Sequence, residues 1–295
     1  MGGTTAKASI IENGEMLLAP EYEVGGGMSV GHRLLKGSGY ILRVPAIDIA
    51  EVSAGGGSVA WVDKGGSLQS GPHSAGAVPG PVCYGKGGSE PTITDANVML
   101  GYLNQTHLLG GAFPINAERA TQVLVDKVAK PLGLSDIEAA YGVHLLVNSS
   151  MGRALRAVSS ERGRDPRKFV MMAFGGGGPI HAVGLADLLG ITKIVVPPSP
   201  GVFSAFGLLF ADVEHHFVQT YLKSLSDMDL GEAQSIFERL VIQGSELLEA
   251  EGFDSSHQEI IYQVDMKYIG QTSELTVGVP STCLLYTSPS PRDRG

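Results

Sequence analysis

Two glycine turns carry residue types that could bind a ligand through the main chain. One turn follows the apolar stretch Phe169–Phe174, which ends in Gly175, Gly176, Gly177 and Gly178. A helical pattern starts at Pro179. A strand, a turn without side chains and a helix N-terminus expose backbone N–H groups and the positive end of a helix dipole. This arrangement favours an anion or a nucleotide, although the same turn could be a tight connection without a ligand.

The second glycine turn lies at the start of the chain. Gly2, Gly3, Thr4 and Thr5 precede two strand-like stretches that flank Asn13-Gly14, a strong hairpin signal. The turn is therefore predicted at the mouth of a β-structure. There it could bind phosphate or merely lead into the hairpin.

Side chains for acid–base chemistry are scattered around these turns. Asp48, Glu51, Glu90 and Asp95 lie in the glycine-rich half, and His181 lies in the first turn of the helix after Gly178. Any of the carboxylates could be a general base or a metal ligand, but carboxylates are also common as helix caps and turn residues. His181 could equally be a polar residue at a helix start. Asp48, Asp95 and His181 are the catalytic candidates.

Other reactive side chains have weaker patterns, and no metal ligands are assigned. His215 and His216 follow Glu214, but adjacent side chains diverge, which favours a solvated pair. Cys83 and Cys283 form neither a disulfide framework nor a zinc-binding spacing. Cys83 lies in a proline-rich loop and has no partner that would mark it as a nucleophile.

The composition narrows the class of protein. The 295 residues are 43% hydrophobic and 17% charged, so a packed core is expected rather than disorder. The net charge of −9 disfavours nucleic acid and anionic membranes as partners. Met1–Lys7 lacks the apolar segment of a signal peptide, so none is expected, and no apolar stretch reaches the roughly 18 residues that a membrane span needs. We therefore expect a cytoplasmic protein. The βαβ unit described next is typical of the α/β class.

The residue patterns predict the main elements. A second hairpin is expected over 58–70, an amphipathic helix over 229–251, and paired strands over 259–268 and 274–279. Helices are expected over 96–103 (capped by Thr94 or Asp95), over 117–130 (capped by Asn116 and stopping before Pro131) and, buried, over 200–210. A long helix over 135–158 is expected to begin with a Ser135/Glu138 capping box and to bury an apolar face that includes Ile137, Tyr141 and Leu145. The strand, glycine turn, helix and strand over 169–196 form a βαβ unit, so a parallel pair is expected. Residues 281–295 resemble a translated sequencing-adapter tail, which leaves one domain over 1–280.

Several stretches, in this order, resemble the hydantoinase A/oxoprolinase family. The stretches are Met1–Lys7, Ala54–Trp61, Ser74–Tyr84, Glu90–Asn97, Glu161–Pro166 and Ala173–Ala182. The resemblance implies a partial actin/sugar-kinase/Hsp70-like ATPase fold, with a β-hairpin and a βαβ unit flanked by helices. It also implies that Gly2 to Thr5 bind the phosphates and metal of ATP, and that Gly175 to Gly178 bind its adenosine.

One departure from the family pattern concerns the first turn. In the family an Asp precedes the residue at the Met1 position, and a similar turn occurs far upstream. The chain is therefore expected to be a C-terminal half, incomplete at its N-terminus, with weakened binding of magnesium and phosphate.

The resemblance implies ATP-dependent hydrolysis of a cyclic amide, a hydantoin or 5-oxoproline, with ATP and Mg²⁺ as cofactors. It also implies a partner subunit or domain of the hydantoinase B type. Two alternatives stay open: the ATP-hydrolysing subunit of an acetone or other ketone carboxylase, and a nucleotide-binding fragment without turnover.

Overall fold

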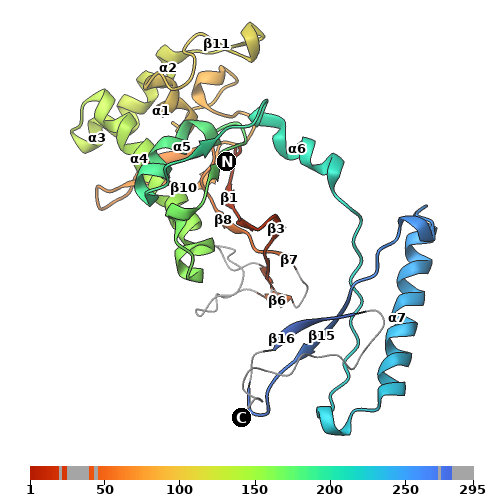
Figure 1. Cartoon of the computed structure of the whole chain (residues 1–295). Helices are drawn as coiled ribbons and strands as arrows, with labels where there is room; N and C mark the ends of the chain where they lie inside the picture. Colours follow the sequence, from red (N-terminus) through yellow and green to blue (C-terminus); the bar gives the residue numbers. More distant parts are fainter. Residues whose placement is uncertain (20–21, 25–39, 43–45, 272–273, 281–295) are drawn as a thin grey trace. The chain divides into compact units, whose positions relative to one another are not determined.

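The computed structural model describes residues 1–19, 22–24, 40–42, 46–271 and 274–280. The chain divides into two compact units, Met1–Asp212 and Val213–Gly295, whose elements are labelled in Figure 1. The predicted non-native tail lies outside the described residues. Among the described residues, no helix combines the length and the apolar character needed to cross a membrane.

A long antiparallel ribbon opens the first unit (Figure 1). Its halves pair in succession: β1 (Ala6–Ala8) with β8 (Ala50–Val52), β4 (Leu18–Ala19) with β7 (Ala46–Ile47), and β5 (Tyr22–Val24) with β6 (Tyr40–Leu42). The predicted hairpin at Asn13-Gly14 is confirmed as β2 (Ile11–Glu12) and β3 (Glu15–Met16), with positive φ at both turn residues. It is shorter than predicted, because β1 pairs with β8 instead of continuing the hairpin.

The second predicted hairpin is also confirmed. It consists of the antiparallel strands β9 (Ser58–Val62) and β10 (Leu68–Ser74). The side chain of Asp63 holds the turn between them, because its Oδ1 accepts hydrogen bonds from the N–H groups of Gly65 and Ser67, both at 2.9 Å.

The helix after this hairpin begins earlier than predicted. α1 spans Ile93–Met99, and its N-cap is Thr92 rather than Thr94 or Asp95. Asp95 is the third residue of the helix, where its carboxylate accepts from the Thr92 N–H and completes a capping box. The cap therefore follows from the Thr-x-x-Asp spacing.

The next helix is capped by Asn116, as predicted, but ends later. It runs as α2 (Ala117–Leu124), a π-helical segment over Val125–Ala129 and α3 (Lys130–Leu132). The predicted stop before Pro131 is wrong, because the chain continues to Gly133, where a left-handed conformation ends the helix. A short hairpin of β11 (His107–Leu108) and β12 (Phe113–Pro114) precedes it.

The predicted long helix is confirmed as α4 (Asp136–Val158), with the expected Ser135/Glu138 capping box. It packs against β1, β8, β10, α1 and α5, so it lies at the centre of the unit's core. Its buried face differs from the predicted apolar stripe, since Ile137, Tyr141 and Leu145 are exposed. Small and branched side chains form the buried face instead: Ala139, Ala140, Val143, Val147, Met151, Ala154, Ala157 and Val158.

The predicted βαβ unit is confirmed. β13 (Met171–Met172) and β14 (Ile194–Val195) are parallel, and α5 (Gly178–Leu189) connects them. α5 begins directly in the glycine turn, at Gly178, and it ends at Gly190, which has positive φ. The glycine turn and the helix N-terminus are thus one feature.

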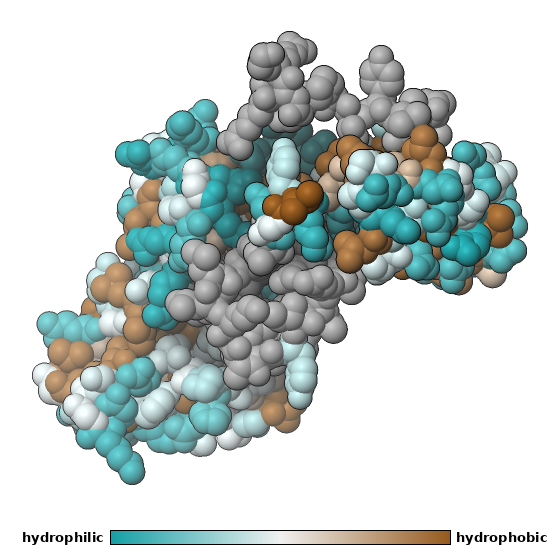
Figure 2. All heavy atoms as spheres, turned by 90° about the horizontal axis from the view of Figure 1, so that it is seen from below, coloured by the Kyte–Doolittle hydropathy of each residue, from teal (hydrophilic) through white to brown (hydrophobic). Residues whose placement is uncertain are grey.

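The predicted buried helix over 200–210 is wrong. It is a short α6 (Phe203–Gly207) between 3-10 turns, and Leu208, Leu209 and Phe210 are more than two-thirds exposed. A short apolar run does not by itself distinguish a buried helix from an exposed segment. On the face drawn in Figure 2, apolar residues occur in small groups among polar ones.

The second unit contains one long helix and one antiparallel strand pair. α7 (Leu230–Ala250) is capped by Asp229, and β15 (Tyr262–Met266) pairs with β16 (Leu275–Val279), as predicted. Among the described residues of this unit, Ala233 alone is buried. The ring of Phe237 on α7 meets that of Tyr262 on β15 edge to face, with centroids 5.5 Å apart.

Candidate functional site

The first glycine turn is held by a second glycine segment, Gly55–Gly57. Within the turn, the N–H of Gly2 donates to the carbonyl oxygen of Thr5 at 3.0 Å. The N–H groups of Gly56 and Gly57 donate to the carbonyl oxygens of Gly2 and Gly3, at 3.0 and 2.6 Å. Carbonyl groups of the turn are therefore directed toward Gly55–Gly57.

Gly55–Gly57 has to be free of side chains for this approach. A Cβ atom at Gly55 would lie 2.4 Å from backbone atoms of Thr4. None of the three glycines has positive φ, so close approach is the reason for glycine here. The start of α1 fixes the segment in turn, because the N–H and the hydroxyl of Thr94 donate to the carbonyl oxygen of Gly56 at 2.9 and 2.8 Å.

The two predicted glycine turns are brought together through Met1. The N–H of Gly177 donates to the carbonyl oxygen of Met1 at 3.1 Å, and the amino group of Met1 donates to the carbonyl oxygen of Phe174 at 2.9 Å. A Cβ atom at Gly175, which has φ of 83°, would lie 2.2 Å from the Met1 oxygen. Residues that are about 170 positions apart in sequence thus form one backbone surface.

One side of this surface is open. An added Cβ atom would meet no other atom within 4 Å at Gly3 or at Gly176, and neither residue has positive φ. In the described part of the chain, the N–H groups of Gly3, Thr4, Thr5 and Gly176 have no hydrogen-bond acceptor. Unpaired backbone donors beside a helix N-terminus form a place where an anion can bind.

The other predicted binding residues have structural partners. The N–H of Gly2 is used within its own turn, that of Gly175 donates to the carbonyl oxygen of Pro200 at 2.7 Å, and that of Gly177 is used by Met1. Gly178 opens α5. These glycines shape the surface, whereas Gly3, Thr4, Thr5 and Gly176 supply the available donors.

His181 lies directly behind this surface, in a buried polar cluster. Its Nδ1 is 2.7 Å from Oδ1 of Asn148, and its Nε2 is 3.4 Å from Nδ2 of Asn97. Nδ1 of His144 is 3.0 Å from Oδ1 of the same Asn97, and the two imidazole rings stack with centroids 4.5 Å apart. All four side chains are buried, and they join α1, α4 and α5.

The partners assign the protons in this cluster. An amide oxygen only accepts, so Nδ1–H of His181 donates to Asn148 and Nδ1–H of His144 donates to Asn97. Nε2 of His181 then accepts from the Asn97 amide, which requires a neutral ring. Burial lowers the pKa of His181 to about 3, with a further contribution from the charge of His144 and of the chain's amino terminus. Burial also lowers the pKa of His144.

The structure places the candidate Asp95 in the core. Its carboxylate accepts from the N–H groups of Val82, Cys83 and Thr92, at 3.1, 2.8 and 2.8 Å, and from the Thr92 hydroxyl at 2.8 Å. Asp95 is fully buried, and these four hydrogen bonds join a loop to the start of α1. Cys83 is also buried, and burial raises the pKa of its thiol, so it is no ready nucleophile.

Three of the acidic candidates, Asp48, Glu51 and Glu90, are paired with cations. Asp48 is buried between β7 and β8, and its Oδ1 lies 2.8 Å from Nη2 of Arg162. Glu51 pairs with Lys7, and Glu90 pairs with Lys127. His215 pairs with Glu251 rather than forming a cluster with His216. Across the described residues, no group of three or more His, Cys, Asp or Glu side chains is arranged to hold a metal ion.

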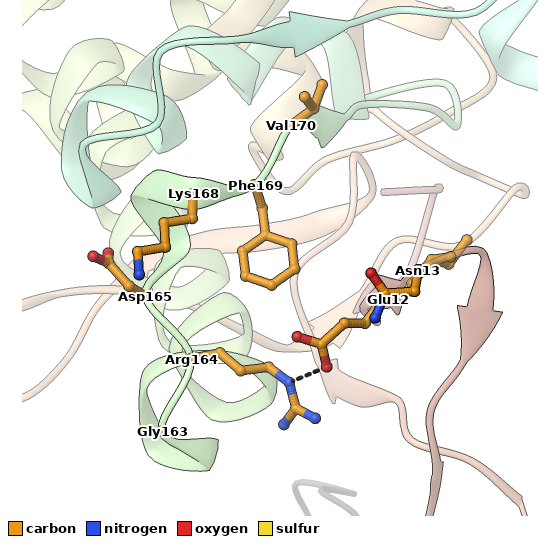
Figure 3. Close-up of a pocket in the computed structure, with 9 residues that line it drawn as sticks. Glu12, Asn13, Gly163, Arg164, Asp165, Lys168, Phe169 and Val170 are labelled. Carbon is orange, nitrogen blue, oxygen red and sulfur yellow. Dashed lines mark hydrogen bonds and ion pairs between the residues drawn. The ribbon is translucent and has the colours of Figure 1, made fainter.

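A separate hollow of about 510 Å³ lies between the β2–β3 hairpin and the segment before β13 (Figure 3). An ion pair of Arg164 and Glu12, with Nε and Oε2 3.2 Å apart, spans it. The pKa of the adjacent Asp165 is held at about 2, chiefly by hydrogen bonds from Arg167. The hollow contains none of the predicted site residues, so it is distinct from the glycine turns.

Two parts of the site were not predicted from the sequence. Gly55–Gly57 stood out as a glycine cluster, but nothing in its own sequence shows which segment it approaches. Asn97, His144 and Asn148 were also missed. His144 and Asn148 had a usable signal, because they are spaced i, i+4 on a helix whose same face carries apolar residues. Polar residues on such a face predict a buried network.

Comparison with known proteins gives a consistent result. The family model described as hydantoinase/oxoprolinase matches residues 1–217, which nearly coincide with the first unit. An uncharacterized protein of Methanocaldococcus jannaschii is 52% identical over 277 residues, which is 94% of this chain and 40% of that protein. The alpha subunit of a caprolactamase from Pseudomonas jessenii is 41% identical over 241 residues, or 81% of this chain and 35% of the subunit.

Solved structures extend the similarity to the fold. A nucleotide-free acetone carboxylase, whose reaction is ATP-dependent, matches with a TM-score of 0.75 and 29% identity, over 95% of this chain and 39% of that one. The ATP-dependent caprolactamase from Pseudomonas jessenii matches with a TM-score of 0.66 and 36% identity, over the same shares. The fold is therefore of the same mixed α/β type. The chain spans about 40% or less of the length of these relatives.

Proposed function

The chain belongs to the hydantoinase/oxoprolinase family, and from this premise we propose that its first unit forms part of the ATP site of an enzyme that opens cyclic amides. The proposal rests on the open side of the backbone surface that the two glycine turns, Gly2–Thr5 and Gly175–Gly178, form together. We call these two segments the joined turns. Gly3 and Gly176 lie there, at positions where a side chain would meet no protein atom, and their N–H groups, like those of Thr4 and Thr5, have no acceptor among the described residues. Glycine at such positions keeps the approach of a ligand free.

The donors fit a polyphosphate better than a neutral ligand. The N–H groups of Gly3, Thr4 and Thr5 lie on consecutive residues, and successive free N–H groups in a turn bind anionic oxygens. The hydroxyl groups of Thr4 and Thr5 can add further hydrogen bonds. Gly176 precedes the N-terminus of α5, whose dipole favours negative charge. The actin/sugar-kinase/Hsp70-like fold and the adenosine contacts of Gly175 to Gly178 form the finer part of this proposal.

The substrate we propose is a cyclic amide such as a hydantoin or 5-oxoproline. An unstrained cyclic amide resists hydrolysis near neutral pH. ATP supplies a phosphoryl group that makes the amide carbon a better electrophile. The contribution of this chain is to orient the phosphates and to offset their charge with fixed donors, which are the main sources of catalysis in phosphoryl transfer. A lactam ring is also what the caprolactamase relative acts on, according to its name.

Magnesium is part of the proposal only through the nucleotide. Among the described residues, no group of three or more His, Cys, Asp or Glu side chains could hold a metal ion. Mg²⁺ commonly keeps water molecules and binds through phosphate oxygens with one or two carboxylates. It would therefore come to this site with ATP.

A second candidate function is the ATP-hydrolysing subunit of a ketone carboxylase. The acetone carboxylase structure, with its TM-score of 0.75, favours this alternative. Both candidate reactions would begin with phosphorylation of a carbonyl oxygen of the substrate. One ATP site could therefore serve either reaction. The relatives are named as subunits, and we propose a partner subunit or domain of the hydantoinase B type. The 295 residues alone would then be a nucleotide-binding piece without turnover.

The test uses the protein expressed from its complete reading frame, with any co-purifying partner. Phosphate release from ATP is measured alone and with 5-oxoproline, hydantoin, caprolactam, or acetone plus bicarbonate. We expect at least one cyclic amide to stimulate release and to yield its ring-opened product. Stimulation by acetone alone would favour the carboxylase. Calorimetry should show affinity falling from ATP to AMP, and a protein that binds neither would overturn the proposed ATP site.

A further inference from the structure

One helix, α1, makes hydrogen bonds to the residues that support each of the joined turns. Thr94 in the first turn of α1 holds the carbonyl oxygen of Gly56, and Gly56 and Gly57 hold the first glycine turn. Asn97, one turn further along α1, contacts His181, which lies in the first turn of α5 just after the second glycine turn. One short helix is therefore linked by hydrogen bonds to both halves of the surface.

From this arrangement we infer that Asn97 and His181 are positioning residues, which set the second glycine turn relative to the first through α1. The inference rests on the proposed ATP site and adds the residues that hold its two halves in register. A ligand that contacts both turns needs them at one fixed separation, because misplacement of about 1 Å can cost a large factor in activity.

The polar character of the cluster supports a positioning role. Apolar side chains could fill this part of the core without leaving any buried hydrogen-bonding group unpaired. The surrounding core is indeed apolar. A hydrogen-bonded buried network favours one arrangement, because a shift leaves buried donors or acceptors without partners. Asn97 uses both ends of its amide, with Oδ1 accepting from His144 and Nδ2 donating to His181.

The packing of α4 against α5 is tight at the same place. A Cβ atom at Gly184 on α5 would lie 2.4 Å from Nδ2 of Asn148, and one at Gly152 on α4 would lie 2.4 Å from Cδ2 of Leu188. The two helices thus approach each other through glycine on both sides. His181 is held by α4 through Asn148 and by α1 through Asn97.

Two substitutions of His181 separate these two links. In His181→Asn the amide nitrogen can replace Nδ1, so the link to Asn148 is kept and the link to Asn97 is lost. In His181→Gln the amide can replace Nε2, so the link to Asn97 is kept and the link to Asn148 is lost. Each variant loses one hydrogen bond of the same residue. A role in stability alone predicts similar effects of the two.

The experiment compares both variants with the wild-type protein in two measurements. For ATP hydrolysis, we expect His181→Asn to raise KM for ATP at least tenfold with a smaller change in kcat, and His181→Gln to raise it less than threefold. Val128→Ala, which opens a cavity elsewhere in the same core, controls for lost stability and should leave KM within twofold. An equal rise of KM in both His181 variants would overturn the inference.

The second measurement needs no ATP. Hydrogen exchange is followed in peptides that contain residues 1–8, 54–58 and 174–178. We expect His181→Asn to speed exchange of the Gly177 amide, which bonds to Met1, at least tenfold more than His181→Gln does. Equal protection in the two variants would contradict the positioning role. A wild-type protein that fails to bind ATP would overturn the proposed function while this comparison still decides the inference.

Discussion

The two sides of the joined glycine turns differ in what they require of a glycine. On the covered side, Gly55 and Gly175 are in contact with other backbone segments, and a single Cβ atom would lie within 2.4 Å of them. On the open side, Gly3 and Gly176 have ordinary φ values and face empty space. Packing explains the first pair completely. It does not explain the second pair, which points to a ligand.

The backbone N–H groups follow the same division. Those of Gly56, Gly57, Gly175 and Gly177 donate to carbonyl oxygens of the chain, whereas those of Gly3 and Gly176 have no acceptor among the described residues. Glycine content alone therefore does not identify a binding surface. The proposed ATP site rests on an open Cβ position and an unpaired donor that occur together in both glycine turns.

The largest expected effect comes from filling the covered side. Gly175→Ala places a Cβ atom 2.2 Å from the Met1 oxygen and forces a residue with a side chain to φ of 83°. The left-handed conformation costs about 1–2 kcal/mol and overpacking about 1–3 kcal/mol. We expect the free energy of unfolding to fall by about 2–5 kcal/mol, as measured by urea denaturation.

A matched substitution on the open side serves as the control for this prediction. Gly176→Ala adds the same methyl group to the adjacent residue. If the two variants lost equal stability, the division into a covered and an open side would be wrong.

Local patterns predicted most of the fold. The Asn13-Gly14 hairpin, the Ser135/Glu138 capping box and the βαβ unit each depend on residues close in sequence, and all three are confirmed. The errors come from the tertiary structure. Pro131 lies near the end of one continuous helical stretch, directly after the π-helical segment Val125–Ala129, and the helix passes through it to Gly133. The true face of α4 is set by its neighbours, so Tyr141 and Leu145 remain exposed.

The site was predictable only in part. Both glycine turns were found from their residue types, because glycine next to an apolar run has a local meaning. That Gly55 approaches Thr4, or that Asn97 reaches His181, depends on contacts between distant segments. The catalytic candidates show the same limit. The buried environments of Asp48 and Asp95 come from Arg162 and from loop N–H groups that no spacing rule connects to them.

A pH dependence of stability is the next expected effect. The pKa of His181 is about 3 in the folded protein, against about 6.5 in an unfolded chain. The unfolded state therefore binds more protons as the pH falls below about 6.5. The stability from the neutral ring is complete above that pH and is lost toward pH 3, by up to about 1.4 kcal/mol per pH unit.

Urea denaturation at pH 6.5 and pH 5 measures this effect. We expect the wild-type protein to lose about 1–2 kcal/mol more over this interval than His181→Gln, which has no group to protonate there. His107→Gln, at an exposed histidine, controls for the loss of an imidazole. Parallel pH profiles of wild type and His181→Gln would show that His181 is not kept neutral by its surroundings.

The smallest effect on stability, and the most informative one, is expected from filling the open side. Gly176→Ala adds a methyl group where no atom lies within 4 Å and where φ is not positive. We expect the free energy of unfolding to change by less than about 0.5 kcal/mol, the usual range for surface substitutions. We also expect ATP affinity to fall about tenfold, because the methyl group occupies the space that the ligand needs.

Gly201→Ala is the control for this result, because Gly201 is also open and has no positive φ. Gly66→Ala is unsuitable, because Gly66 has positive φ. Calorimetry with ATP should show wild-type affinity for Gly201→Ala. If Gly176→Ala also bound ATP as the wild type does, the open space at Gly176 would not be the place where the nucleotide lies. Neither packing nor a bound nucleotide would then explain why position 176 is a glycine.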